Sequence, residues 1–189
     1  HNGAGKSTFL RCLCGLEKKF KGRTIIDGEV LNAKAMLKRS YMVMQDVNHQ
    51  LFSESVEDEI QLGMAEEHQD QVQQVAVELD LTGLLQRHPM SLSGGQKQRT
   101  AIASATLAGK SILIFDEPTS GLDYRHMQQT AALLKRLREE NDIIFVITHD
   151  PELIADCCTH VFHMEEGRLK ELYPLDAEHR ERFLQQFGY

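Results

Sequence analysis

Two patterns of apolar residues take turns along this chain: continuous apolar runs, and apolar residues spaced three or four positions apart. Continuous apolar runs rich in β-branched residues predict four strands, at 40–44, 111–115, 142–148 and 160–164. The second and third runs hold long stretches without a polar residue, so we expect strands covered on both faces. Between them, apolar residues recur every three or four positions and predict a helix over about 124–140. This alternation is typical of an α/β fold with a mostly parallel sheet.

The stretch 47–106 differs, because it has no convincing strand pattern and many Glu, Gln and Asp residues. One helical face in it carries Val72, Val75, Ala76 and Leu79, so a helical insertion is predicted. A hairpin over 23–30 is expected to turn at Asp27-Gly28. We expect one domain over 1–189, with a core at about 1–46 and 107–173, a helical subdomain at about 47–106 and a C-terminal helix at about 175–187.

Composition narrows the functional classes. The chain has 189 residues, of which 41% are apolar and 26% are charged, as in an ordinary globular domain. A net charge of −7 weighs against non-specific binding of nucleic acid. The sequence contains no long uncharged apolar stretch, so it predicts no membrane-spanning helix. Four cysteines are too few for the disulfide framework of a secreted protein.

The sharpest motif stands at the beginning of the chain. It matches the phosphate-binding loop G-x-x-x-x-G-K-[ST] without its leading Gly and consists of Asn2, Gly3, Ala4, Gly5, Lys6, Ser7 and Thr8. The two glycines let backbone amides converge on a polyphosphate, Lys6 neutralises the outer phosphates, and Ser7 offers a hydroxyl to Mg²⁺. A helix from Lys6 to about Leu16 should point its positive end at the phosphates. The alternative is a glycine-rich turn without this function.

Two adjacent carboxylates end the apolar run at 112–115. Asp116 and Glu117 would stand at the carboxyl edge of a buried strand, where ligands of open α/β sheets bind. Asp116 is suited to hold Mg²⁺ through water, and Glu117 to act as general base on the attacking water. The alternative is a surface turn before Pro118, which fits poorly at the end of a fully apolar strand.

A second glycine pair predicts another anion site. Ser93 can cap the helix that follows, while Gly94 and Gly95 let its amides approach a γ-phosphate. The stretch Leu92-Ser93-Gly94-Gly95-Gln96 resembles the signature motif of the ATP-binding cassette (ABC) ATPases. The resemblance covers about 2–170 and implies a P-loop NTPase (RecA-like) fold with an inserted helical subdomain.

Further motifs occur in the order of that family. Gln45 looks like the Q-loop glutamine, which contacts Mg²⁺ and water; Asp123 ends a stretch that looks like the D-loop; and His149 looks like the switch histidine on the γ-phosphate. The stretches 45–52 and 55–63 resemble the ATPases of energy-coupling factor importers, which take up vitamins and transition-metal ions. The segment 48–52 departs slightly from the usual aspartate-containing form.

The resemblance implies an ATPase that uses ATP and Mg²⁺ and works as a dimer, homomeric or heteromeric. Mg-ATP would be held by the phosphate loop, Gln45, Asp116 and His149 of one protomer and by Ser93, Gly94, Gly95 and Gln96 of the other. Glu117, His149 and Lys6 would carry the catalysis. The expected setting is the cytoplasmic face of the membrane, beside a transmembrane partner that imports a vitamin or metal ion. The rivals are a soluble ABC ATPase acting on ribosomes or nucleic acid, from a tandem protein, and a module without turnover.

The beginning of the chain carries one more expectation. It starts at His1 with neither an initiator Met nor a signal peptide. The family has a strand and an antiparallel β region before the phosphate loop, including an aromatic residue that stacks on adenine. We therefore expect an N-terminally truncated cassette whose antiparallel β region is largely missing and which binds ATP weakly by itself.

Overall fold

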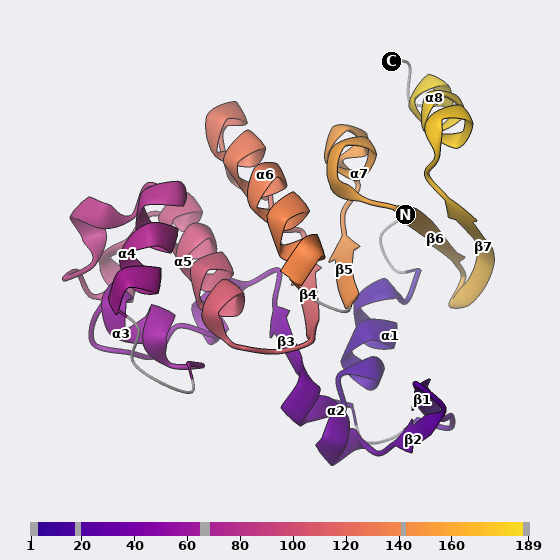
Figure 1. The fold of residues 1–189 in the computed structure, drawn as a ribbon, viewed down its shortest axis with the longest axis horizontal. Helices are drawn as coiled ribbons and strands as arrows, with labels where there is room; N and C mark the ends of the chain where they lie inside the picture. Colours follow the sequence, from indigo (N-terminus) through magenta and orange to yellow (C-terminus); the bar gives the residue numbers. More distant parts are fainter. Residues whose placement is uncertain (1–3, 18–19, 65–68, 141–142, 187–189) are drawn as a thin grey trace. The chain divides into compact units, whose positions relative to one another are not determined.

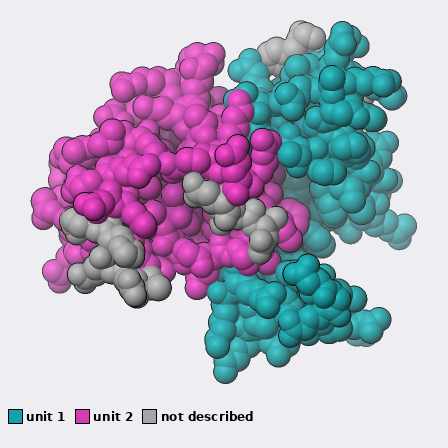
Figure 2. All heavy atoms as spheres, in the orientation of Figure 1, with its two compact units in different colours: residues 1–40, 147–189 teal, residues 41–146 magenta. Residues whose placement is uncertain are grey.

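The structure is a computed structural model that describes residues 4–17, 20–64, 69–140 and 143–186. The chain divides into two compact units, residues 1–40 with 147–189 and residues 41–146 (Figure 2). Each unit is described by itself below. The predicted subdomain boundaries remain predictions.

The first unit contains helices and two antiparallel hairpins. Its elements are α1 (Lys6–Leu13), β1 (Thr24–Ile26), β2 (Glu29–Leu31), α2 (Ala33–Arg39), α7 (Pro151–Cys157), β6 (His160–Glu165), β7 (Arg168–Pro174) and α8 (Ala177–Gln186). The β1–β2 hairpin turns at Asp27 and Gly28, both at positive φ, which confirms the predicted hairpin. The predicted C-terminal helix is α8; residue 187 lies outside the described residues.

Helix α1 ends earlier than predicted. It stops at Leu13 instead of about Leu16, because Gly15 adopts a left-handed φ of 77°. The amide of Gly15 donates to the carbonyl of Cys12, and the amide of Leu16 donates to the carbonyl of Arg11. This pair of bonds is the Schellman motif, which satisfies the last carbonyls of a helix and turns the chain away.

The second unit contains most of a three-stranded sheet and the predicted helices. Its elements are β3 (Ser40–Val43), α3 (Val56–Gln61), α4 (Gln69–Glu78), α5 (Gly94–Leu107), β4 (Ile112–Asp116), α6 (Tyr124–Glu140) and β5 (Ile143–Ile147), with short 3-10 helices at Val47–His49, Thr82–Leu84 and Pro89–Ser91. The strand order is β3-β4-β5 in a parallel sheet (Figure 1). Ser40, the first residue of β3, and Ile147, the last residue of β5, belong to the first unit.

One expectation about this sheet is wrong. All five residues of the central strand β4 are buried, as predicted for a strand covered on both faces. Residues 143–146 of β5 are only half-buried, although their sequence is equally apolar. The reason is position, since β5 is the last strand in the sheet order of the described residues and β4 lies between two neighbours.

The helical stretch is confirmed. Every element described between 47 and 106 is a helix, and α5 packs against α3 and α4. The four residues of the predicted apolar face are at most 2% exposed: Val72, Val75 and Ala76 on α4, and Leu79 directly after it. They share a core with Val56 and Ile60 of α3 and Ile102 of α5, each fully buried. No helix among the described residues is long and apolar enough to cross a membrane.

Two helices begin with the same cap. Asp123 before α6 and Asp176 before α8 each accept a bond at Oδ1 from the amide of the His three positions later, His126 or His179, at 3.0 Å. The Nδ1 atom of that His lies 2.8 Å from the same oxygen. The hydrogen bonds from the His amide and then from its ring lower the pKa of both carboxyl groups.

These caps make stability depend on acid pH. A carboxyl group whose pKa is lower in the folded chain stabilises it above the unfolded-state value of 3.8. That contribution is lost as pH falls from about this value through the folded-state pKa. We expect Asp176→Asn, which keeps the acceptor oxygen but does not titrate, to lose less stability than the wild type below pH 4. Urea unfolding of both proteins between pH 3 and pH 6 measures this, and equal losses would contradict it.

Candidate active site

The predicted phosphate loop, residues 2–8, begins the first unit and keeps that name below. Asn2 and Gly3 lie outside the described residues; Ala4 is buried, and Gly5 is the N-cap of α1 at a left-handed φ of 87°. Helix α1 starts at Lys6 as predicted, and Gly5 supplies no side chain to cap the first-turn amides. A glycine in this conformation before a helix N-terminus fits an anion, because the amides and the helix dipole both favour negative charge. Ser7 and Thr8 follow in the first turn.

The turn between β6 and β7 lies against this loop. The amide of Gly167 donates to the carbonyl of Ala4 at 3.1 Å, and a Cβ atom on Gly5 would lie 3.5 Å from the Cα atom of Gly167. One turn along α1, the rings of Phe9 and Phe162 stack with their centroids 5.3 Å apart. The hairpin thereby holds the loop from one side.

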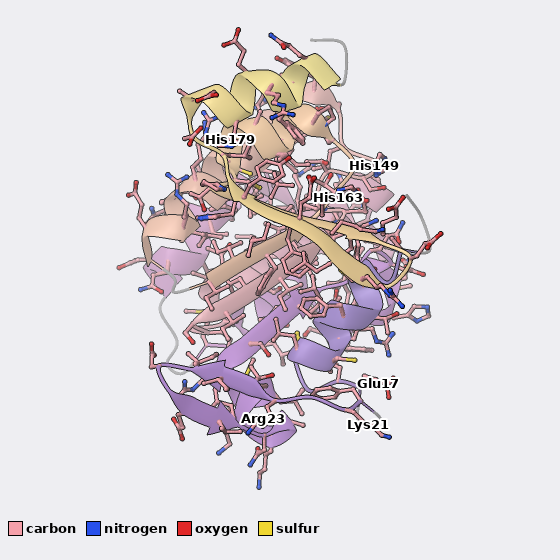
Figure 3. The ribbon with its side chains drawn as sticks, turned by 90° about the vertical axis from the view of Figure 1, so that its right-hand side faces the viewer. Glu17, Lys21, Arg23, His149, His163 and His179 are labelled. Carbon is pink, nitrogen blue, oxygen red and sulfur yellow. The ribbon has the colours of Figure 1, made fainter. Side chains whose placement is uncertain are left out.

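An open hollow of about 690 Å³ lies beside the loop. Its lining includes Gly5, Thr8, Phe9 and Phe20, with Lys21 and Arg23 from the segment that joins α1 to β1 (Figure 3). This size is typical of small-molecule sites. The sequence pattern did not indicate the hollow, because its walls come from separate parts of the chain.

His149 belongs to the same unit as the phosphate loop. It is exposed and directly follows Thr148 after β5 (Figure 3). The amide of Asp150 donates to Oγ1 of Thr148 at 3.1 Å, and Asp150 itself caps α7. The turn that carries His149 is therefore held on both sides by side-chain bonds.

The two predicted carboxylates stand at the end of β4 in the second unit. Asp116 is the last residue of the strand and is 5% exposed. Glu117 follows at a φ of 53°, a left-handed conformation that is uncommon for a residue with a side chain. Such strained positions cluster at functional sites. A buried carboxylate at a strand end also suits the role of Mg²⁺ ligand that the sequence predicts for Asp116.

Gln45 is exposed in the loop after β3, and this loop is held by a residue that sequence reasoning missed. The side chain of Gln50 accepts from the amide of Met44 and donates to the carbonyl of Met42, both at 2.6 Å. The side-chain amide of Gln50 thus makes the pair of backbone hydrogen bonds that a neighbouring strand would otherwise make at the end of β3. Lys97 of α5 donates to Oδ1 of Asn48 at 2.8 Å and ties the same loop to α5.

Glu59 is a second missed residue. It is 1% exposed on α3, and its Oε2 accepts from the amides of Phe52 and Ser53, both at 2.8 Å. Burial and then the charge of Glu59 raise the pKa of Tyr41. An acidic residue between Val56 and Ile60 on an apolar helix face was the signal in the sequence.

The second glycine pair opens α5 as predicted. Ser93 Oγ accepts from the amide of Gln96 at 3.3 Å, and Oε1 of Gln96 accepts from the amide of Ser93 at 2.9 Å. This is a capping box, which leaves other first-turn amides for a ligand. A Cβ atom on Gly94 would meet nothing within 4 Å, whereas one on Gly95 would lie 3.2 Å from the carbonyl oxygen of Gly121. The structure therefore brings the glycine pair against the loop that ends at Asp123.

Curated proteins similar to this chain are ATP-binding proteins of transporters. A putative ABC transporter ATP-binding protein of Treponema denticola is 50% identical over 172 residues, which are 90% of this chain and 35% of the relative. Another from Pyrococcus abyssi is 35% identical and is covered over 71% of its length. The molybdenum import ATP-binding protein ModC of Pseudomonas aeruginosa is 35% identical. The chain spans about a third of the first two relatives.

Solved structures agree with the fold. The chain matches cbiO1 from Clostridium perfringens, part of the ABC transporter complex cbiONQ, with a TM-score of 0.78, 29% identity and coverage of 99% of this chain and 79% of the other. An ATP-bound bacterial Atm1-family exporter matches with a TM-score of 0.80 and 27% identity, over all of this chain and 36% of the other. The family profile described as ABC transporter matches residues 1–120. The phosphate loop, the capped glycine pair and the carboxylates after β4 thus stand in a chain that belongs to the ABC transporter family of ATP-binding proteins.

Proposed function

We propose that this chain is the ATP-binding and ATP-hydrolysing part of a membrane transporter. The observation that carries the proposal is Glu117, an acid held at a left-handed φ directly after the buried Asp116. Members of the family bind ATP with Mg²⁺ as the usual cofactor. Bound Mg²⁺ would neutralise charge on the phosphates, with Ser7, Gln45 and Asp116 as the residues to hold it.

The chemistry assigned to the chain is hydrolysis of the γ-phosphate of ATP. Glu117 accepts a proton from water as the water oxygen attacks the γ-phosphorus, and ADP and phosphate are the products. Lys6 and His149 stabilise the negative charge of the phosphoryl group. Asn2, Gly3, Ala4, Gly5 and Thr8 hold the phosphates through the loop, and the nucleoside would extend toward the hollow beside Thr8.

A dimer is the proposed working unit. Each chain carries one phosphate loop and one glycine pair, so Ser93, Gly94, Gly95 and Gln96 would complete the site of a second protomer. The exposed Gly94 and the capped first turn of α5 support this role. Asp123 would face the partner protomer as part of the D-loop. The dimer would act at the cytoplasmic face of the membrane.

The finer proposal is uptake of a vitamin or a transition-metal ion through a transmembrane partner. The likeness to ModC and to cbiO1, named for an importer and a transporter complex, supports it. The second candidate is a soluble ABC ATPase within a tandem-cassette protein. The first two relatives, of which this chain spans about a third, are long enough to hold a second cassette, but their names are those of transporter proteins.

Co-purification separates the two candidates. The intact protein, tagged and expressed at native level, is recovered from detergent-solubilised membranes and from the soluble fraction. We expect it to come with a subunit that spans the membrane several times. Recovery with ribosomes or nucleic acid would overturn the transport proposal and support the soluble one.

A further inference from the structure

Five charged or titratable side chains gather in the second unit where α4, α5 and α6 meet. Asp80 follows α4, Arg99 lies on α5, Asp123 precedes α6, and Arg125 and His126 lie in its first turn. This group is called the Asp80 cluster below. None of its members other than Asp123 has a role in the proposed function.

His126 lies between two carboxylates of the cluster. Its Nδ1 atom is 2.8 Å from Oδ1 of Asp123, and its Nε2 atom is 3.6 Å from Oδ2 of Asp80. The His126 side chain is 14% exposed, and its Nε2 has no hydrogen-bond partner among the described residues. One imidazole therefore joins segments that are far apart in the sequence.

Asp80 is held in an unusual conformation. Its φ is 54°, which a residue with a side chain adopts at a cost in energy. Its carboxylate lies 3.9 Å from Arg125 as well as near His126. The turn after α4 therefore presents this carboxylate to the beginning of α6.

Arg99 is the member of the Asp80 cluster that lies on α5. It is 6% exposed, and its Nε has no hydrogen-bond partner within the described part of the chain. Burial lowers the pKa of Arg99, while the charges of Asp80 and Asp123 act in the opposite direction. The two carboxylates that His126 joins therefore both attract the buried cation of α5.

The backbone contact between α5 and the loop before α6 is close. The carbonyl oxygen of Gly121 would lie 3.2 Å from a Cβ atom on Gly95, and the side chain of Leu122 3.4 Å from it. The loop that ends at Asp123 thus lies directly against Gly95, so a movement of this loop would displace the glycine pair.

We propose that His126 is a positioning residue that joins Asp123 to Asp80, so that the loop 120–123 moves together with α4 and with α5, which packs against α4 and carries the glycine pair. The proposal rests on the proposed function, in which both the loop and the glycine pair serve the site of a partner protomer. His126 touches neither nucleotide nor water in this role. His126 instead affects the fraction of time in which the loop and the glycine pair are in position to complete the nucleotide site of the partner protomer.

Two substitutions separate the link from the helix cap. In His126→Asn the shorter amide still reaches Asp123 but not Asp80, whereas His126→Gln reaches further, toward Asp80. We expect His126→Asn to lower kcat for ATP by roughly 2- to 30-fold with little change in KM or in nucleotide affinity. His126→Gln should recover part of the lost kcat.

A matched control is provided at the other cap. His179 contacts Asp176 with the same two distances, and no second carboxylate lies within ion-pair distance of it among the described residues. His179→Asn should therefore leave kcat unchanged. Thermal unfolding of each variant shows whether the folded state is retained.

A double-mutant cycle with Asp80→Asn completes the test. If the two residues act through one link, the double variant loses no more kcat than the more impaired single variant. Wild-type kcat in His126→Asn, or losses that multiply in the double variant, would overturn the inference. Failure of the proposed function is distinguishable, because the wild-type protein would then hydrolyse no ATP or would do so equally well with Glu117→Gln.

Discussion

Glu117→Gln is expected to reduce ATP turnover by about 10²- to 10⁴-fold, the usual contribution of a general base. Glutamine has the shape of glutamate but cannot accept the proton of the attacking water. The left-handed backbone at position 117 costs Gln about as much as Glu, so the fold should not change. The binding of Mg-ATP is expected to persist, because Glu117 acts on water and not on the phosphates.

The measurement is single-turnover hydrolysis by the intact protein together with equilibrium binding of ATP. Glu139→Gln serves as the control, because Glu139 is an exposed acid in the last turn of α6 and has no part in the site. Normal turnover in Glu117→Gln would contradict the role of this residue. Loss of binding with loss of turnover would indicate damage to the nucleotide site instead.

Gly15→Ala is expected to lower the free energy of unfolding by about 2–5 kcal/mol. Two effects combine at this position. The φ of 77° is unfavourable for alanine, and a Cβ atom would overlap the carbonyl oxygen of Ala33 and come within 2.9 Å of the Cα atom of Ala33. Because that obstacle is backbone of α2, it cannot turn aside as a flexible side chain can.

Gly28→Ala is the matched control for that substitution. Gly28 has a similar φ of 80°, yet a Cβ atom there would meet nothing within 4 Å. It should therefore show the conformational cost alone, about 1–2 kcal/mol. Urea unfolding of the two variants measures the difference, and equal destabilisation would refute the predicted clash between Gly15 and Ala33.

Several elements of the fold were not predicted, and the reasons differ. Strand β7 is almost entirely exposed and rich in charge, so it has no apolar pattern to find. Helix α7 did have a local signal, since Asp150 caps it and Pro151 stands at its first position. Helix α1 was predicted too long because Gly15 was not recognised as the residue that ends it.

Local interactions explain why much of the chain could be predicted from sequence. The bounds of α6, the start of α1 at Lys6, the turn at Asp27 and Gly28 and the helix cap at Ser93 depend on residues at most four positions apart or on one repeating apolar face. The motifs that carry chemistry are of the same kind, because a phosphate loop or an Asp-Glu pair is continuous in the chain.

Sequence by itself therefore determined the α/β class, the helical stretch and the residue types of the candidate site. Tertiary structure decided which side chains hold them in place: Gln50 beside the end of β3, Glu59 under the amides of Phe52 and Ser53, and His126 between Asp123 and Asp80. Except for the contact between His126 and Asp123, which lie three positions apart, these contacts join residues whose separation in the chain follows no period, and a long side chain can make them from many positions. Only the folded backbone determines which partner comes within hydrogen-bond distance.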